Sequence, residues 1–252
     1  MIHIDKHDTI TIITLDRPTR KNAIDHTTAL QLEQAFLDFD ADEHANVAIL
    51  QGSNGTFSSG ADLKEIAKGN PNPLSPIGTA PLGPSRLLLS KPVIAAITGH
   101  AVAGGLELAL WCDLRIIEED AVLGVFCRRW GVPLIDGGTI RLPRLIGLSR
   151  ALDLILTGRE VHAQEALSIG LVHRVVPKGC AQEHALTLAK QISSFPQTAL
   201  RNDRIGAYEQ FSQDLPTALL HEFNRGMASI HTQETISGAK RFVFHKQTQK
   251  EE

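Results

Sequence analysis

The sequence predicts an α/β protein that continues into a helical C-terminal region, and three patterns support this interpretation. Residues 9–15 alternate threonine with aliphatic side chains, which is typical of a β-strand with one buried face. The wholly apolar stretch 47–50 and the second buried stretch 93–98 are typical of strands in a parallel sheet that is covered on both faces. From about residue 149 the apolar spacing becomes almost entirely helical, which marks a second subregion of the chain.

The first half of the chain alternates strands with loops and helices. Residues 16–23 are expected to form a loop, because proline fixes φ and aspartate and asparagine favour local hydrogen bonds. A helix follows over about 25–39, where apolar residues recur on one stripe. The polar, glycine-rich stretch 51–64 comes after a strand, where α/β proteins place ligand-binding loops. Within it, Asp62 is expected to cap or flank a short helix, which leaves the amide of Ala61 near an open helix start.

Residues 69–84 contain five prolines and few large apolar side chains, which predicts a mobile surface loop. Such a segment either shapes or covers a binding pocket, or serves as a plain linker. A helix over residues 86–89 is expected to end at Pro92, because the residue before a proline is disfavoured in the helical conformation.

Residues 99–113 contain three glycines followed by a leucine- and alanine-rich run, which predicts a buried helix that begins near Gly104. Glu107 then lies on the same face, one turn further along. Amides of a first helical turn have no intrahelical acceptor, so the Gly104 amide can bind a developing oxyanion while Glu107 acts as a base. Alternatively, the glycines only permit close helix packing and Glu107 is a solvated helix residue.

The remaining elements follow from the same spacing rules. Strands are expected at 114–117 and 121–125, a loop at 126–133 and a helix start at 136–139. Further helices are expected over 149–157, 162–169, 180–194, 197–212, 215–229 and 233–245, with one strand at 172–176 and a frayed polar tail over 247–252.

The composition restricts the class of function. A formal net charge of −3 over 252 residues argues against a general nucleic-acid or anionic-membrane surface. Three widely spaced cysteines suggest neither a disulfide framework nor a metal site. The N-terminus shows no export signal, and no apolar run approaches the length of a membrane span. These features favour a cytoplasmic protein that acts on a small molecule.

Two loop-to-helix junctions thus each offer a backbone amide, at Ala61 and Gly104, and two amides that meet at one oxygen form an oxyanion hole. The segments 57–63 (FSSGADL) and 99–113 (GHAVAGGLELALWCD) resemble the two signature segments of the enoyl-CoA hydratase/isomerase (crotonase) family. Further matches, in the order of the family, lie within residues 17–23, 137–147 and 156–172.

The resemblance implies a core built as a spiral of ββα units over residues 1–195. It implies that residues 196–252 form a helical region that closes the pocket and builds a homotrimer or a hexamer. The implied substrate is an acyl-CoA, whose thioester enolate the Ala61 and Gly104 amides stabilise, with no cofactor beyond the CoA of the substrate. By position, the CoA site would include Lys21, Ala23, Ser59, Ala61, Leu63, Lys64, Gly104 and Cys127. The two lysines either approach CoA phosphates or are solvated surface residues.

Glu107 matches one of the two glutamates with which hydratases of this family add water across a 2-enoyl double bond. The position of the second falls on Cys127, and a thiol of pKa about 8.5 is a poor substitute for a carboxyl of pKa about 4.3. Either Glu107 acts alone, or a carboxylate such as Asp136 takes the second role, or the reaction is not hydration. Asp136 is alternatively the cap of a helix that begins at Gly137.

The predicted function is therefore that of a lyase that adds water to a 2-enoyl-CoA through an enolate held in an oxyanion hole. The alternative within enzymes is an enoyl-CoA isomerase, in which a carboxylate moves a proton along the acyl chain. A third possibility, from another class, is a scaffold protein that binds acyl-CoA without turnover.

Overall fold

The computed structural model describes residues 1–248, and its contacts divide the chain into two compact units, Met1–Lys190 and Gln191–Glu252. The expected boundary lay a few residues further along, after residue 195. The larger unit holds both β-sheets and the smaller unit is helical. Among the described residues, no helix is both long and apolar enough to cross a membrane.

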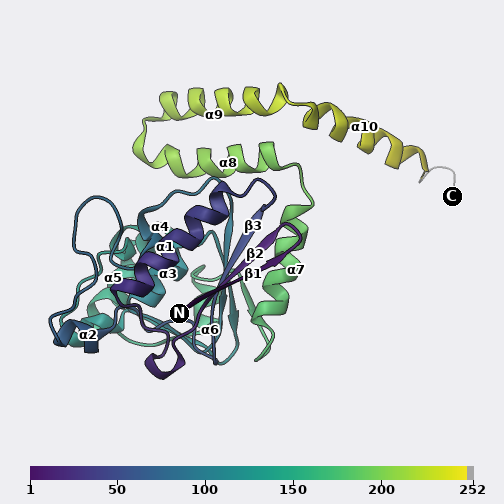
Figure 1. The fold of residues 1–252 in the computed structure, drawn as a ribbon. Helices are drawn as coiled ribbons and strands as arrows, with labels where there is room; N and C mark the ends of the chain where they lie inside the picture. The colour runs from purple at the N-terminus through teal and green to yellow at the C-terminus, as the bar shows by residue number, and fades with distance from the viewer. Residues whose placement is uncertain (249–252) are drawn as a thin grey trace. The chain divides into compact units, whose positions relative to one another are not determined.

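The main sheet of the larger unit has six strands in the order β1-β2-β3-β4-β6-β9, and the first three are labelled next to one another in Figure 1. Strands β1 and β2 pair antiparallel, and every other neighbouring pair is parallel. A second sheet has the order β5-β7-β8. The strands of the main sheet are β1 (Ile2–His7), β2 (Ile10–Leu15), β3 (Val47–Gly52), β4 (Val93–Ile97), β6 (Leu114–Glu118) and β9 (Arg174–Val176), and those of the second are β5 (His100–Val102), β7 (Val122–Gly124) and β8 (Val161–His162).

Pairs of strands followed by a helix recur along the chain. Strand β4 joins the main sheet, β5 joins the second sheet, and helix α3 (Gly104–Trp111) follows. Strands β6 and β7 repeat this pattern, followed by the 3₁₀ helix η3 (Phe126–Trp130) and α4 (Gly138–Ile146). The isolated bridge between Ser58 and Ala101 joins the segment after β3 to the second sheet in the same way. In each of these repeats, the chain thus passes from the main sheet to the second sheet and then enters a helix.

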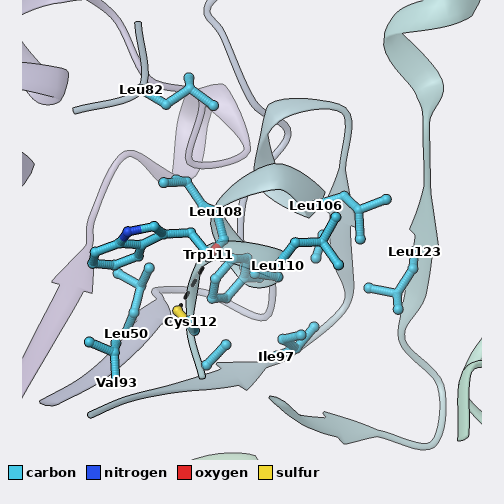
Figure 2. Close-up of a cluster of buried hydrophobic side chains, with 14 of the residues drawn as sticks. Leu50, Leu82, Val93, Ile97, Leu106, Leu108, Leu110, Trp111, Cys112 and Leu123 are labelled. Carbon is cyan, nitrogen blue, oxygen red and sulfur yellow. Dashed lines mark hydrogen bonds between the residues drawn. The ribbon is translucent and has the colours of Figure 1, made fainter. Parts of the chain in front are cut away.

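Helix α3 lies at the centre of the core, because all of its residues are buried. Figure 2 shows its leucines and Trp111 among side chains of the main sheet and of β7. Phe36 of α1 (His26–Ala41) meets the Trp111 ring edge to face, with centroids 4.7 Å apart. The other helices of this unit are α2 (Leu63–Ala67), α5 (Leu148–Thr157), α6 (Ala163–Ser168) and α7 (Ala181–Ser193), whose last turn extends past its boundary.

Most expected elements are confirmed, and the differences arise from contacts with other parts of the chain. Strand β1 was not predicted, because its side chains are mostly exposed and only its pairing with β2 defines it. The helix expected over 86–89 is wrong: only a 3₁₀ turn, η2 (Pro84–Arg86), forms. Leu87 is extended, and its carbonyl accepts a hydrogen bond of 2.8 Å from Trp111 Nε1 instead of from a helical amide.

The smaller unit consists of helices α8 (Gln197–Glu209), α9 (Leu215–Ile230) and α10 (Gln233–Thr248), with a 3₁₀ turn η4 (Gln210–Ser212). Helices α8 and α9 run side by side (Figure 1), joined by hydrogen bonds of 2.9 Å from Arg225 Nε to Glu209 and from Asn202 to Ser229. Of the polar tail expected over 247–252, residues 247 and 248 end α10 and residues 249–252 lie outside the described residues.

Candidate active site

A cavity of about 610 Å³ lies in the larger unit, and every site residue nominated by the sequence lines it. The cavity wall is mostly apolar, with a small number of polar groups, which is the usual character of a small-molecule site. The nominated residues among its lining are Lys21, Ala23, Ser59, Ala61, Leu63, Lys64, Gly104, Glu107, Cys127 and Asp136.

The loop around Ala61 is fixed by hydrogen bonds of its neighbours, and the Ala61 amide itself takes part in none of them. The Ile24 amide donates to Gly60 O at 2.8 Å and the Asp62 amide donates to Ile24 O at 3.0 Å, so both neighbours of Ala61 are engaged. The loop is fixed from behind by Ser58, whose hydroxyl donates to Asn22 O and accepts from the Gly60 amide. Among residues 1–248, the Ala61 N–H has no acceptor.

The second amide lies where α3 begins, as the sequence predicted. Ala103, just before the helix, has φ +54 and ψ −125, a conformation that an L-residue adopts only under constraint. Its amide donates to Gly124 O at 2.9 Å, and its carbonyl accepts from Leu106 and Glu107. Within the described part of the chain, the Gly104 amide has no acceptor, as expected for a first-turn position.

Gly60, the residue before Ala61, packs closely against Gly104. Gly60 has φ +86, and a Cβ placed on it would lie 2.5 Å from Gly104 N. Only glycine is therefore compatible with both the backbone conformation and the approach. Ala61 and the first residue of α3, Gly104, both line the same cavity.

Glu107 is a buried carboxylate, so the interpretation as a solvated helix residue is wrong. Its Oε1 accepts hydrogen bonds from Asp136 N at 3.0 Å and from Gly138 N at 2.8 Å. A Cβ at Gly138 would lie 2.9 Å from Oε1, so glycine is needed for this approach. Glu107 thus lies at the positive end of α4, where a carboxylate is stabilised.

The electrostatics of the site favour a carboxyl that titrates near neutrality. Burial, together with the smaller effect of the Asp136 charge, raises the pKa of Glu107 to about 7, against the hydrogen bonds from the Gly138 and Asp136 amides, which lower it. The pKa of the Cys127 thiol is also raised, first by burial and then by the charge of Glu107. Cys127 is therefore a neutral thiol beside the carboxylate, which is the unreactive form of cysteine.

Asp136 lies beside Glu107 but does not cap α4, so that interpretation is wrong. Helix α4 has Gly137, which lacks a side chain, at its N-cap position, and the Gly138 amide donates to Glu107. The Asp136 carboxylate instead accepts from the Leu82 amide at 3.0 Å and from the Ser85 hydroxyl. Burial raises the pKa of Asp136 as well. No local pattern in the sequence links residues 82–85 with Asp136, and these partners were missed.

The proline-rich segment shapes the cavity, so the plain-linker interpretation is wrong. Pro71, Asn72, Leu74, Pro81 and Leu82 all line the cavity. The segment is anchored by Asn72, whose Nδ2 donates to Ile24 O at 3.0 Å and to Pro81 O at 2.6 Å. The mobility expected of this segment stays a prediction.

The rim of the cavity carries the two nominated lysines. Lys21 and Lys64 are both exposed. Asp62 caps α2, as predicted, by accepting from the Lys64 amide at 3.1 Å, and it also pairs with Arg17 at 3.1 Å. The same Arg17 donates to the Ala23 carbonyl, so one guanidinium connects the first loop of the chain to the start of α2.

The chain is similar to known proteins over nearly its whole length. A family model described as "Enoyl-CoA hydratase/isomerase" matches residues 5–252. The "Probable enoyl-CoA hydratase echA8" of Mycobacterium leprae is 33% identical over 242 residues, which cover 96% of this chain and 94% of that protein. The "Carnitinyl-CoA dehydratase" of Citrobacter koseri is 33% identical over 256 residues, covering 96% and 95%. The crystal structure of enoyl-CoA hydratase EchA1 from Mycobacterium marinum matches with a TM-score of 0.91 at 31% identity, covering 97% and 96%.

Proposed function

The chain belongs to the enoyl-CoA hydratase/isomerase family, and we propose that its cavity binds an acyl-CoA thioester whose carbonyl oxygen lies between the amides of Ala61 and Gly104. As the α-carbon gains or loses a proton, negative charge develops on that oxygen, and fixed donors in a water-poor site stabilise it. Glu107 is the group that moves the proton. The observation that carries the proposal is a buried carboxyl of raised pKa in the same cavity as two unbonded amides.

Hydration of a 2-enoyl-CoA is the reaction that this arrangement supports best. Ionised Glu107 removes a proton from water, the oxygen of that water bonds to the β-carbon, and the double-bond electrons move to the thioester oxygen as an enolate. Collapse of the enolate requires a proton at the α-carbon. Cys127 is a poor donor, because its thiol pKa is raised. Asp136, a second buried carboxyl that lines the cavity, is the stronger candidate for this step.

Isomerisation is the second candidate function. Two neighbouring carboxyls and a thiol in place of a second glutamate suit removal of a proton from one carbon and its return to another, because this reaction needs no activated water. In this case Glu107 and Asp136 act on the acyl chain directly. A non-catalytic acyl-CoA scaffold is the remaining alternative.

Absorbance of the conjugated thioester separates these functions. The purified protein is incubated with crotonyl-CoA and, separately, with a 3-enoyl-CoA. Loss of conjugation with crotonyl-CoA supports hydration, and gain of conjugation with the 3-enoyl-CoA supports isomerisation. Neither change, at high enzyme concentration, would contradict both and leave the scaffold.

Lys21 and Lys64, which are exposed on the rim of the cavity, lie near the phosphates of the bound CoA.

The smaller unit assembles the chain into a homotrimer or a hexamer. Assembly is supported by α9, which exposes Leu215, Leu219, Leu220, Phe223 and Ile230. Exposed apolar surface of this extent is typical of an interface. Light scattering after gel filtration is expected to give three or six times the mass of the 27.4 kDa chain, and a monomer would contradict it.

A further inference from the structure

The carboxyl of Asp136 is held by residues that precede it by more than fifty positions in the chain. Leu82 N donates to its Oδ1 at 3.0 Å, and the Ser85 hydroxyl donates to the same oxygen. Ser85 is 2% exposed and Asp136 4% exposed, so water has little access to the hydrogen bond between them. A hydrogen bond between a hydroxyl and a buried carboxylate is among the stronger kinds in proteins.

Arg141 fixes the backbone of both partners at once. Its Nη1 donates to Asp136 O at 2.8 Å and its Nη2 donates to Ser85 O at 2.6 Å. The short turn η2 and the start of α4 are therefore held at a set separation by one planar guanidinium. The backbones of Ser85 and Asp136 therefore keep their relative positions without the Ser85 hydroxyl. The hydroxyl acts only on the orientation of the Asp136 carboxyl.

This anchoring is one-sided. Both donors bond to Oδ1, whereas Oδ2 has no hydrogen-bond partner among the described residues. Oδ2 is not one of the fully buried side-chain atoms of these residues that lack a partner, so it is accessible from outside the protein interior. Because Asp136 lines the cavity, Oδ2 is the oxygen that opens onto it. Glu107 has the same arrangement, with Oε1 anchored by two amides. In each carboxyl, two donors of the chain thus bind one and the same oxygen.

We propose that Ser85 is a positioning residue that fixes the rotation of the Asp136 carboxyl and thereby aims Oδ2 at the substrate. This inference rests on the proposed role of Asp136 in the second proton transfer. Without the hydroxyl, Oδ1 keeps only the Leu82 amide, and the carboxyl can turn about its last side-chain bond. The substrate-binding wall is unchanged by this loss, because Ser85 itself does not line the cavity.

The test is a double-mutant cycle with Ser85→Ala and Asp136→Asn, measured as kcat and KM on whichever enoyl-CoA is turned over. Ser85→Ala is expected to lower kcat by about tenfold to a hundredfold, the worth of one hydrogen bond to a charged group, with KM changed less than about twofold. In the Asp136→Asn background, the same substitution is expected to have no further effect. A general loss of structure would lower kcat in both backgrounds.

Two further variants control the experiment. Ser90→Ala removes a matched pair on the surface, where the Ser90 hydroxyl donates to Asp40 at 2.8 Å, and is expected to leave kcat unchanged. Ser85→Cys keeps the side-chain volume but donates weakly, and is expected to give an intermediate kcat if Ser85→Ala does not fold.

The outcomes distinguish the inference from the function on which it rests. Full activity of Asp136→Asn would overturn both the role of Asp136 and the role of Ser85. An impaired Asp136→Asn together with an unimpaired Ser85→Ala, or with additive losses in the double variant, would overturn the positioning role alone.

Discussion

The backbone amide of Asp136 donates a hydrogen bond of 3.0 Å to the carboxylate of Glu107, and the Gly138 amide donates another of 2.8 Å to the same oxygen. The residue that we assign to proton transfer is therefore oriented by the segment that also carries the second carboxyl. Neither contact needs a substrate to form. The site is preorganised, which lowers the reorganisation required in the transition state.

The pH dependence of the reaction follows from the raised pKa of Glu107. As a base it acts when ionised, so kcat/KM is expected to fall about tenfold per pH unit as the pH drops below a pKa of about 7. The charged groups that bear on this pKa are Asp136, which raises it, and Arg141, which lowers it. Steady-state rates measured from pH 5 to pH 9 test this; an acid limb near pH 4.5 would contradict it.

The same pKa predicts that Glu107 destabilises the fold at alkaline pH. A carboxyl whose pKa is higher in the folded chain than in the unfolded chain binds its proton more tightly when folded, so stability falls as pH rises from about 4.3 towards about 7. Glu107→Gln removes this cost. We expect it to raise the melting temperature at pH 8 by more than at pH 5.

The control for this prediction is Glu65→Gln. Glu65 forms a surface ion pair of 2.8 Å with Lys68, and hydrogen bonding to that lysine lowers its pKa. Because its pKa moves in the opposite direction, this variant is expected to show no stabilisation at pH 8. An equal gain for both variants would argue against a specific cost at Glu107.

The approach of Gly60 to Gly104 makes a steric prediction about the oxyanion hole. In Gly60→Ala the new Cβ would meet Gly104 N at 2.5 Å, so the amide has to move and kcat is expected to fall by about 10²–10³, the usual cost of losing one donor. Gly69→Ala is the matched control, since Gly69 has φ +85 and nothing within 4 Å of the added Cβ. It carries the same backbone strain and is expected to keep its kcat.

Cys127 is expected to contribute little to catalysis in spite of its place beside Glu107. Its thiol is buried and neutral, because burial and the charge of Glu107 both raise its pKa. Cys127→Ser is therefore predicted to change kcat by less than about threefold. A loss on the order of 10³ would show that the thiol takes part in the reaction.

The sequence was sufficient for the parts of the site that depend on neighbouring residues. The glycine-rich start of α3 and the Asp62 cap of α2 are local patterns, and both form where they were expected. The unbonded amide of Gly104 follows from the same helix start. The sequence also predicted that Gly104 and Glu107 share one face of α3, because they are one helical turn apart.

The parts of the site that depend on tertiary packing could not be predicted from the sequence. The carboxyl of Asp136 was open to interpretation as a helix cap, because nothing near it in the chain showed that Glu107 would take the Gly138 amide. Its partners Leu82 and Ser85 lie in a proline-rich region whose path is set by contacts with distant residues. The short helix expected before Pro92 failed for the same reason, since Trp111 binds the Leu87 carbonyl.

The central claim is that Glu107 moves the proton in a site that binds substrate by other groups. The most direct test is Glu107→Gln, followed by absorbance of the conjugated thioester for turnover and by calorimetry with a non-reactive acyl-CoA for binding. Turnover is predicted to fall by about 10²–10⁴, the typical contribution of a general base, while the affinity for the acyl-CoA changes less than about threefold. Turnover equal to that of the unmodified chain would contradict the claim.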